Sequence, residues 1–329
     1  MARHGDVRLH YSGAVLGIGV FDGDASAFAA LQGEGAAAFE EQLSGLSAQG
    51  LARPEWWFVA EQAGTPVGRV AFMTDSPTPD AGSATDPLME AFLIGLWLRW
   101  GTDDLEVGPR LLSAALPSVA ALGPPIDARV NAESQSHPDR RRAVLEAAGF
   151  GLFQEKLGFV WQDEGSPVPL GDRLIFRSLP EVGESAFAAA LSAGCAETLD
   201  RNDRYFYDLT GAQRWGEVMM GFLVPDDAPT WRLAYDADGR LVGYVMLSAF
   251  DDDVATITHI GVLPEHRGQG YIVDLLARAT ADALTRGFSS ILSDVDTENL
   301  PMRAAMERAG HLPGVRPWHV WHYRFPPPD

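Results

Sequence analysis

The chain contains the segment Val262-Leu263-Pro264-Glu265-His266-Arg267-Gly268-Gln269-Gly270-Tyr271, set between an alternating apolar strand and an apolar-striped helix. The glycines at 268 and 270 allow the backbone to turn tightly, so that its N–H groups point into one concavity. A helix that opens near Tyr271 adds the positive end of its dipole there. The segment therefore predicts a cradle for an anion such as a pyrophosphate.

The flanking residues predict a strand before the cradle and a helix after it. Residues 256–262 alternate in polarity, as a half-buried strand does. The helix is indicated by apolar residues at three- and four-residue steps, namely Ile272, Leu275, Leu276, Ala279 and Ala283. Two other phosphate-binding classes are excluded, because the segment has neither G-x-G-x-x-G nor a Gly-Lys-Ser/Thr.

The segment resembles motif A of the GCN5-related N-acetyltransferase (GNAT) superfamily, in which Arg/Gln-x-x-Gly-x-Gly/Ala follows a strand ending in Val-x-Pro. Arg267 and Gly270 fit this pattern, whereas Ile272 stands where the family has Gly or Ala. The family's next landmarks are an Asn after the following strand and a helix ending near Glu-x-x-Gly-Phe. Here they correspond to Asn299 and to the run 307–311.

The resemblance implies a fold and a cofactor. The family has an α/β (α+β) fold with a mixed sheet that splays open between its fourth and fifth strands, and acetyl-CoA is wedged into the split. The pantetheine arm would lie along the main chain from Ile260 to Val262, and the N–H near Val262 would polarise the thioester carbonyl. The implied cofactor-binding residues are Ile260, Val262, Arg267, Gly268, Gln269, Gly270, Tyr271, Ile272 and Asn299.

Internal repeats predict two tandem GNAT-like domains. Residues 61–70 parallel residues 235–245 as two strands joined by a Gly-containing turn, and residues 142–150 parallel residues 303–311. A chain of 329 residues has room for two domains, each with its own core. We expect domains at 1–165 and 172–329, joined by a linker over 165–172 with two prolines.

The first half has acidic residues where the second half has its cradle. Aligning Leu111-Leu112 with Leu275-Leu276 places Asp103, Asp104 and Glu106 opposite Arg267, Gly268 and Gly270, Gly108 opposite Ile272 and Pro109 opposite Val273. Carboxylates would repel a pyrophosphate, and a proline removes one N–H donor. We predict a degenerate first domain without cofactor. A solvated acidic turn is the alternative, and it would equally leave no cofactor site.

Polarity patterns also predict the elements of the second half. They are strands at 173–178, 231–236, 241–249, 290–295 and 318–325, helices at 181–193, 211–222 and 299–309, and an irregular acidic and aromatic stretch at 197–208.

His259 is the candidate catalytic base, because it lies on the strand that would face the thioester and imidazole titrates near neutrality. The alternative is a histidine that packs or hydrogen-bonds inside the sheet. Family members often take the acid from a Tyr seven residues after the Asn, but that position is Met306 here. Tyr323, on the last strand, is a second candidate for the acid.

No metal site is predicted. His319 and His322 lie three apart on a strand and would point to opposite faces. The single cysteine, Cys195, excludes an internal disulfide, fits a reducing compartment, and is expected to be a small buried residue.

The family commonly builds its acceptor site from the first two helices and their connection. In this chain that connection carries carboxylates and aromatic rings that would receive a cationic amine by ion pairing and cation–π contact. The candidate acceptor residues are Asp200, Asp203, Tyr205 and Asp208. A solvated surface loop is the competing interpretation.

Composition narrows the partners. A net charge of −20 argues against nucleic acid and favours a cationic small molecule or simply high solubility. The chain has no apolar stretch of membrane-spanning length and no signal-peptide core, which predicts a cytoplasmic protein without a membrane partner. The sequence leaves the oligomeric state open.

The combined patterns predict an N-acetyltransferase whose second half transfers acetyl from acetyl-CoA to a primary amine on a small molecule. Two alternatives remain at this stage. One is a binding or regulatory protein that keeps a cofactor pocket without turnover, and the other is transfer to a peptide or protein amine.

Overall fold

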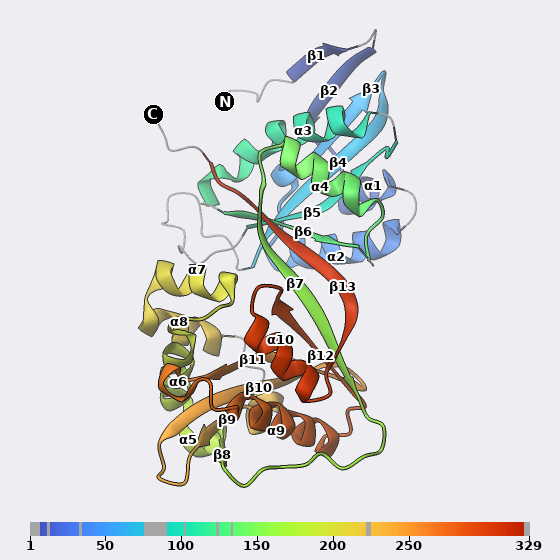
Figure 1. Ribbon diagram of the computed structural model, residues 1–329. Coiled ribbons are helices and arrows are strands. Elements are labelled where there is room, and N and C mark those ends of the chain that lie inside the picture. Colours follow the sequence, from blue (N-terminus) through green and yellow to red (C-terminus); the bar gives the residue numbers. More distant parts are fainter. Residues whose placement is uncertain are drawn as a thin grey trace. The chain divides into compact units, whose positions relative to one another are not determined.

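The computed structural model describes residues 7–11, 14–32, 35–75, 91–101, 103–122, 125–132, 134–221 and 225–325 (Figure 1). The chain forms two compact units. Unit 1 comprises residues 1–153 and 319–329, and unit 2 comprises residues 154–318.

The boundaries of the units differ from the predicted 1–165 and 172–329. Strand β7 (Gly151–Gln162) begins in unit 1, but from Lys156 onward it pairs with strand β12 (Ser290–Asp296) of unit 2. Strand β13 (Leu312–Tyr323) begins in unit 2, while Trp321 near its end belongs to the core of unit 1. Local polarity patterns cannot show which sheet a strand completes, because that depends on pairing between distant segments.

Unit 1 is a mixed sheet with helices. Its first strands run in the order β1-β2-β3-β4-β5-β6, antiparallel except for the parallel pair β5·β6. The strands are β1 (Val7–Tyr11), β2 (Ala14–Val20), β3 (Trp57–Gln62), β4 (Thr65–Thr74), β5 (Ala91–Leu98) and β6 (Ile126–Asn131). The helices are α1 (Ala25–Ala30), α2 (Ala36–Ala48), α3 (Asp104–Ala115) and α4 (Pro138–Ala147), with 3-10 turns at Pro54–Trp56 and Leu116–Leu122.

Unit 2 repeats this plan. Its strands run in the order β8-β9-β10-β11-β12-β7, antiparallel except for the parallel pair β11·β12. The strands are β8 (Ile175–Ser178), β9 (Arg232–Tyr235), β10 (Leu241–Asp251), β11 (Val254–Val262) and β12 (Ser290–Asp296). The helices are α5 (Leu179–Val182), α6 (Glu184–Cys195), α7 (Arg201–Thr210), α8 (Ala212–Met220), α9 (Tyr271–Thr285) and α10 (Leu300–Arg308), with 3-10 turns at Pro225–Thr230 and Pro264–His266.

A glycine contact common to both units supports the predicted alignment of the halves. A β-carbon placed on Gly68 of β4 would lie 3.3 Å from the Leu111 side chain of α3. A β-carbon on Gly243 of β10 would lie 3.2 Å from the Leu275 side chain of α9. The same close approach of helix to strand therefore recurs in the two units.

Helices α6 and α9 cover opposite faces of the sheet in unit 2. Tyr244 of β10 lies against Gly194 of α6, whereas its neighbour Val245 belongs to the apolar cluster under α9 with Leu276. Successive strand residues point to opposite faces, so the two helices sandwich the strand.

The sheet of unit 2 opens between β11 and β12, as the resemblance implied. The two strands pair only from Val254 to Thr256 of β11. A register shift then follows, because Met246 of β10 faces His259 while Leu247 faces Ile257. This bulge bends β11 away from its parallel neighbour, and the strand from His259 onward borders the opening.

The prediction of an irregular stretch over 197–208 was wrong for its second part, because α7 begins at Arg201. Asp200 caps that helix, its carboxylate accepting hydrogen bonds from the backbone N–H groups of Asn202 (3.0 Å) and Asp203 (3.1 Å). Phe206 is buried from the same helix. Asp is a preferred N-cap residue, so Asp200 could have indicated a helix start. The other acidic residues around it made this signal hard to recognise.

Candidate active site

The opening of the sheet in unit 2 holds two adjoining pockets, of about 450 Å³ and about 210 Å³. They share five lining residues, namely Gly194, Thr198, Ile260, Asn299 and Met302. The larger pocket contains the predicted cradle and the smaller one contains His259. We treat them together as one cleft.

The cradle has the backbone that the sequence predicted. Gly268 and Gly270 have φ angles of +76° and +80°, which disfavour residues with a β-carbon. Gly270 is the N-cap of α9, so the first N–H groups of that helix lack intrahelical partners and face the turn. A β-carbon on Gly268 would meet no atom within 4 Å, which leaves the concavity open.

Most of the predicted cofactor residues line the larger pocket. They are Ile260, Val262, Arg267, Gly268, Gly270, Tyr271, Ile272 and Asn299. Gln269 is not among the lining residues, and its carbonyl instead accepts a hydrogen bond from Arg173 Nη1 at 3.2 Å. The geometry brings these residues together, while their binding of a cofactor stays a prediction.

Arg267 braces the wall of the cleft. Its guanidinium donates to the Val262 carbonyl at 3.0 Å and to the carbonyls of Gly194 (2.9 Å) and Ala196 (2.7 Å). These last carbonyls lie at the C-terminal end of α6, where the helix dipole favours a cation. Arg267 therefore fixes α6 and the end of β11 at the position the cleft requires.

The backbone of β11 points hydrogen-bond donors into the opening. Leu263 N–H donates to the Val242 carbonyl of β10 at 2.9 Å. Directions alternate along a strand, so the N–H groups of Val262 and Ile260 point the other way, toward the split. This is the orientation that the oxyanion role implied for Val262 demands.

His259 sits at the centre of a polar cluster. Its Nε2 lies 2.9 Å from Asp203 Oδ2 of α7, and its Nδ1 lies 3.1 Å from the Tyr244 hydroxyl of β10. Cys195 Sγ, at the end of α6, lies 4.0 Å from Nε2. The imidazole keeps 12% of its side chain exposed, so one edge of the ring reaches the smaller pocket.

Small residues make room for the Tyr244 ring. A β-carbon on Gly261 would lie 2.6 Å from the Tyr244 hydroxyl, and one on Gly194 would overlap the ring. The ring stacks on His259 with an interplanar angle of 14°. Because Tyr244 is fully buried, it holds His259 in place from behind.

The electrostatics of the cluster favour a charged imidazole. Burial alone would lower the pKa of His259, but the Asp203 carboxylate outweighs it and raises that pKa well above its ordinary value. Burial also raises the pKa of Tyr244 well above its ordinary value, so the phenol keeps its proton. This differs from the expectation that His259 titrates near neutrality, which took no account of Asp203.

The smaller pocket also contains a half-buried lysine that the sequence patterns did not indicate. Lys156 of β7 lies 2.7 Å from Asp294 and 3.6 Å from Asp200. Burial alone would lower the pKa of Lys156, but these two carboxylates raise it. Burial likewise opposes ionisation of Asp200, while Lys156 lowers its pKa. Two of the acids in the pocket are therefore already paired with a cation.

Several predicted site residues do not join this cleft. Tyr205 and Asp208 lie on α7 outside the lining of both pockets, and Tyr205 packs edge-on against Phe206. Tyr323 belongs to unit 1, where its ring packs 5.3 Å from that of Phe150. Tyr323 is not among the residues that line either pocket, and its assignment as the acid stays a prediction.

Tyr244 in the smaller pocket and Arg173 near the cradle were not predicted. Tyr244 lies in the repeat that aligns Gly68-Arg69-Val70 with Gly243-Tyr244-Val245, yet a tyrosine within an apolar strand carries no catalytic signal by itself. Arg173 lies at the mouth of the cradle, 4.0 Å from a β-carbon placed on Gly270, and is ion-paired with Asp274 of α9. Its position there follows from contacts across about a hundred residues of sequence.

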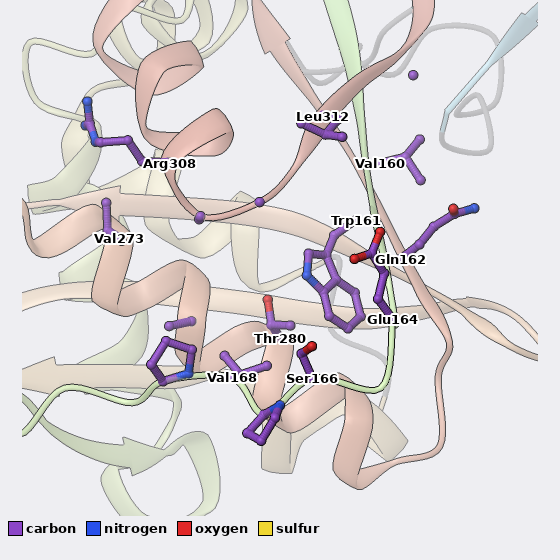
Figure 2. A pocket seen from close by; sticks show the side chains of 16 residues that line it. Val160, Trp161, Gln162, Glu164, Ser166, Val168, Val273, Thr280, Arg308 and Leu312 are labelled. Atoms are coloured by element: carbon purple, nitrogen blue, oxygen red, sulfur yellow. The ribbon is translucent and has the colours of Figure 1, made fainter.

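Unit 2 has another pocket, of about 790 Å³, which shares no lining residue with the cleft. Figure 2 shows its labelled side chains, including Trp161 of β7, Thr280 of α9 and Val168. Val168 lies in the predicted linker, which thus borders a pocket of unit 2. None of the predicted site residues lines it, so its volume alone does not mark it as the active site.

The corresponding helix start in unit 1 carries the acidic residues that the alignment placed there, and two of them are ion-paired. Asp103 is the N-cap of α3, and the buried Asp104 pairs with Arg140 at 3.0 Å. Glu106 pairs with Arg110 at 3.2 Å. Whether this unit binds a cofactor stays a prediction.

Comparison with known proteins supports the resemblance. Residues 195–311 match the Acetyltransferase (GNAT) family, a range that includes the cradle and the whole His259 cluster. Residues 195–311 are a GNAT-type acetyltransferase domain. This confirms the prediction of an N-acetyltransferase-type enzyme, since the family transfers acyl groups to amines and generally uses acetyl-CoA. A comparison with curated protein sequences gave no match.

Solved structures of low sequence identity share the fold over both units. A GNAT from Sphaerobacter thermophilus is 16% identical, with 88% of this chain and 85% of that one covered and a TM-score of 0.54. A GNAT from Kribbella flavida is 16% identical, with 92% and 96% covered and a TM-score of 0.53. A tandem GNAT protein from the clavulanic acid biosynthesis pathway is 16% identical, with 95% and 100% covered and a TM-score of 0.52.

These likenesses confirm the predicted fold class of two tandem GNAT-like domains. Within the part of the chain that is described, no helix has both the length and the apolar character needed to cross a membrane.

Proposed function

We propose that the GNAT domain of unit 2 binds acetyl-CoA and transfers the acetyl group to a primary amine on a small molecule. The observation that carries this proposal is the continuity of the cleft. It joins an anion cradle at Gly268 and Gly270 to the polar cluster around His259 through shared walls. A cofactor that carries both a pyrophosphate and a thioester needs an anion cradle that is connected to the pocket where the reaction takes place.

The residues present fit the cofactor. The N–H groups at the start of α9 would receive the pyrophosphate, and Arg173 stands beside them. The N–H groups of Ile260 and Val262 would hold the pantetheine arm and the thioester carbonyl. When bound, acetyl-CoA supplies an acetyl group activated as a thioester.

The chain's own contribution is positioning and charge. Holding an amine in line with the thioester can account for roughly 7 to 11 kcal/mol of the barrier. Asp203 faces the smaller pocket together with His259, so the pair is placed to orient the amine and to take part in moving its proton. Tyr244 acts as a positioning residue, because its fully buried hydroxyl contacts the imidazole.

The smaller pocket supports a small acceptor. Its volume of about 210 Å³ suits a compact molecule better than a folded protein surface. Its carboxylates, Asp200, Asp203 and Asp294, outnumber the lysine and histidine that face them. This imbalance favours an acceptor that is cationic before it loses a proton.

A non-catalytic acyl-CoA-binding protein is the second candidate. The observation that favours it is Met306, which is buried and lines the smaller pocket where family members often have a tyrosine acid. A thioether cannot protonate a leaving thiolate. Under this alternative the cleft would bind the cofactor without turnover.

Calorimetry with acetyl-CoA, followed by a free-thiol release assay over a panel of amines, separates the candidates. We expect one binding event per chain and release of CoA thiol with at least one small primary amine. Binding without release on any amine would support the non-catalytic alternative. An absence of binding would contradict both.

A further inference from the structure

The polar cluster at the centre of the cleft has the composition of a metal site. We propose that Cys195, Asp203 and His259 bind one Zn²⁺ ion. The three residues come from the end of α6, from α7 and from β11, and each offers one ligand atom. No sequence motif predicts this site, because its residues are separated by up to 64 positions along the chain.

The distances fit a zinc ion after small adjustments. The three ligand atoms all lie within 4.8 Å of one another, with Sγ to Nε2 at 4.0 Å and Nε2 to Oδ2 at 2.9 Å. Zinc bonds of about 2.3 Å to sulfur and 2.0–2.2 Å to nitrogen and oxygen place tetrahedral ligand atoms roughly 3.3 to 3.7 Å apart. Side-chain shifts of less than about 1 Å would therefore complete the site.

The surroundings of His259 are those of a metal ligand. A ligating histidine usually hydrogen-bonds through its other ring nitrogen, which fixes the ring. Here Nδ1 lies 3.1 Å from the Tyr244 hydroxyl, while Nε2 is the atom directed at both Asp203 and Cys195. The same ring is therefore anchored through Nδ1 and directs Nε2 at two candidate ligands.

The smaller pocket supplies both access and the fourth position. All three residues line it, and its volume of about 210 Å³ leaves space for a water ligand. A site with three protein ligands and one open position is typical of accessible zinc sites. Thiolate and imidazole together favour zinc over magnesium or calcium, which prefer oxygen ligands.

Binding exchanges protons for the metal. The Cys195 thiol loses its proton to form the Zn–S bond, and the imidazolium loses the Nε2 proton to form the Zn–N bond, so two protons enter solution for each ion bound. The Asp203 carboxylate moves from the Nε2 proton to the metal. No electron transfer is involved.

The site implies a form of control over the proposed acetyl transfer, and this consequence alone rests on the proposed function. Zinc would engage His259 and Asp203 together, so the pair could neither orient an amine nor exchange a proton with it. The ion would therefore inhibit transfer, and a chelator would restore it.

Cobalt substitution tests the site directly, because Cys195 is the only cysteine in the chain. A thiolate bound to Co²⁺ gives a ligand-to-metal charge-transfer band in the near ultraviolet, and here that band has one possible source. We expect the band to appear on addition of one equivalent of Co²⁺ to the full-length protein and to disappear when Zn²⁺ displaces the cobalt.

Variants assign the ligands. Cys195→Ser should remove the band, and Asp203→Asn should weaken Co²⁺ binding by about 10-fold or more. Asp208→Asn is the matched control, since Asp208 lies on the same helix outside both pockets. We expect it to bind Co²⁺ like the unaltered protein.

The outcomes separate this proposal from the proposed function. A missing charge-transfer band, or equal Co²⁺ affinity in Asp203→Asn and Asp208→Asn, would overturn the zinc site whatever the enzyme does. A clear band in a protein that shows no acetyl transfer would uphold the site and count only against the transferase.

Discussion

In the repeated segments Gly68-Arg69-Val70 and Gly243-Tyr244-Val245, unit 1 carries a guanidinium where unit 2 carries a phenol. Arg69 is fully buried, lies 3.9 Å from the centre of the Phe39 ring, and donates to Gln32 at 2.5 Å. Tyr244 is equally buried but contacts His259. One strand position thus supports packing in one unit and a polar cluster in the other.

The splits in the two sheets differ in the same way. In unit 1, β5 pairs with β6 only from Ala91 to Leu93, and a pocket of about 600 Å³ follows. The Phe39 ring lies directly over Gly95 there, leaving no room for a β-carbon. The fold keeps the opening in both units, whereas the residues at the helix start differ, with left-handed glycines in unit 2 and acidic side chains in unit 1.

The largest expected effect is a loss of acetyl-CoA affinity when the cradle of unit 2 is given an acidic residue like those of unit 1. Gly270→Asp places a carboxylate beside the pyrophosphate position, and like charges about 5 Å apart at an effective dielectric near 20 cost about 3 kcal/mol. We expect acetyl-CoA affinity to fall by at least about 100-fold, measured by calorimetry.

Two variants control for this result. Gly287→Asp changes another open, left-handed glycine, just past the other end of α9, and should leave affinity unchanged. Glu106→Gly in unit 1 should also have no effect. Gly108→Asp is a poorer control, because a β-carbon there would lie 2.6 Å from Val144. A loss of binding in Glu106→Gly would show that unit 1 carries a cofactor site.

The second prediction uses Phe150 and His311, which occupy equivalent positions in the repeats and are both buried. Burial lowers the pKa of His311 to about 4, and neither of its ring nitrogens has a hydrogen-bond partner among the residues that the structure describes. Below the unfolded pKa of about 6.5, the His311 imidazole binds a proton in the unfolded chain but stays neutral in the folded chain. Stability should therefore fall between about pH 6.5 and pH 4, by up to about 3 kcal/mol.

Chemical denaturation across this pH range measures the effect. His311→Phe copies the residue of unit 1 and should remove this part of the acid sensitivity. An unchanged pH dependence in His311→Phe would mean that other groups account for the loss.

The third prediction sharpens the contrast in chemistry. His259→Gln removes the charged imidazole while keeping a polar side chain of similar length. We expect turnover to fall by about 100-fold, with little change in acetyl-CoA affinity, because the cradle lies in the other pocket. Single-turnover kinetics in the presence of a chelator would measure it, and a fully active variant would return His259 to a structural role.

The smallest expected effects are changes in stability of opposite sign at Arg69 and Tyr244, which occupy the same position in the two repeats. Burial lowers the pKa of Arg69 to about 10, and its Nε and Nη1 have no hydrogen-bond partner in the described part of the chain, so Arg69→Met should stabilise the protein by about 1 kcal/mol. Tyr244→Phe leaves His259 Nδ1 without its partner and should destabilise by a similar amount. Thermal unfolding of both variants would check this, and equal signs would show that the two positions are not energetically distinct.

Sequence patterns predicted the parts of the site that lie close together along the chain. The cradle, the strand before it and the helix after it form a continuous run, so two glycines and an apolar stripe were enough to place them. Ile272, which departs from the family pattern, still lines the cleft and packs beside the core. Of the candidate acceptor residues, Asp200 and Asp203 line the smaller pocket, whereas Tyr205 and Asp208 of the same segment do not.

By itself the sequence determined the tandem repeat, the glycine turn before α9 and the acidic residues at the corresponding place in the first half, because these depend on local spacing and charge. Only the tertiary structure brought Cys195, Asp203 and Tyr244 to His259, placed Lys156 among the acids, and carried the end of β13 into unit 1. These depend on which strands pair and which helix covers which face. Strand pairing and helix placement depend on the burial of apolar surface over the whole core, so they cannot be predicted from any short stretch of sequence.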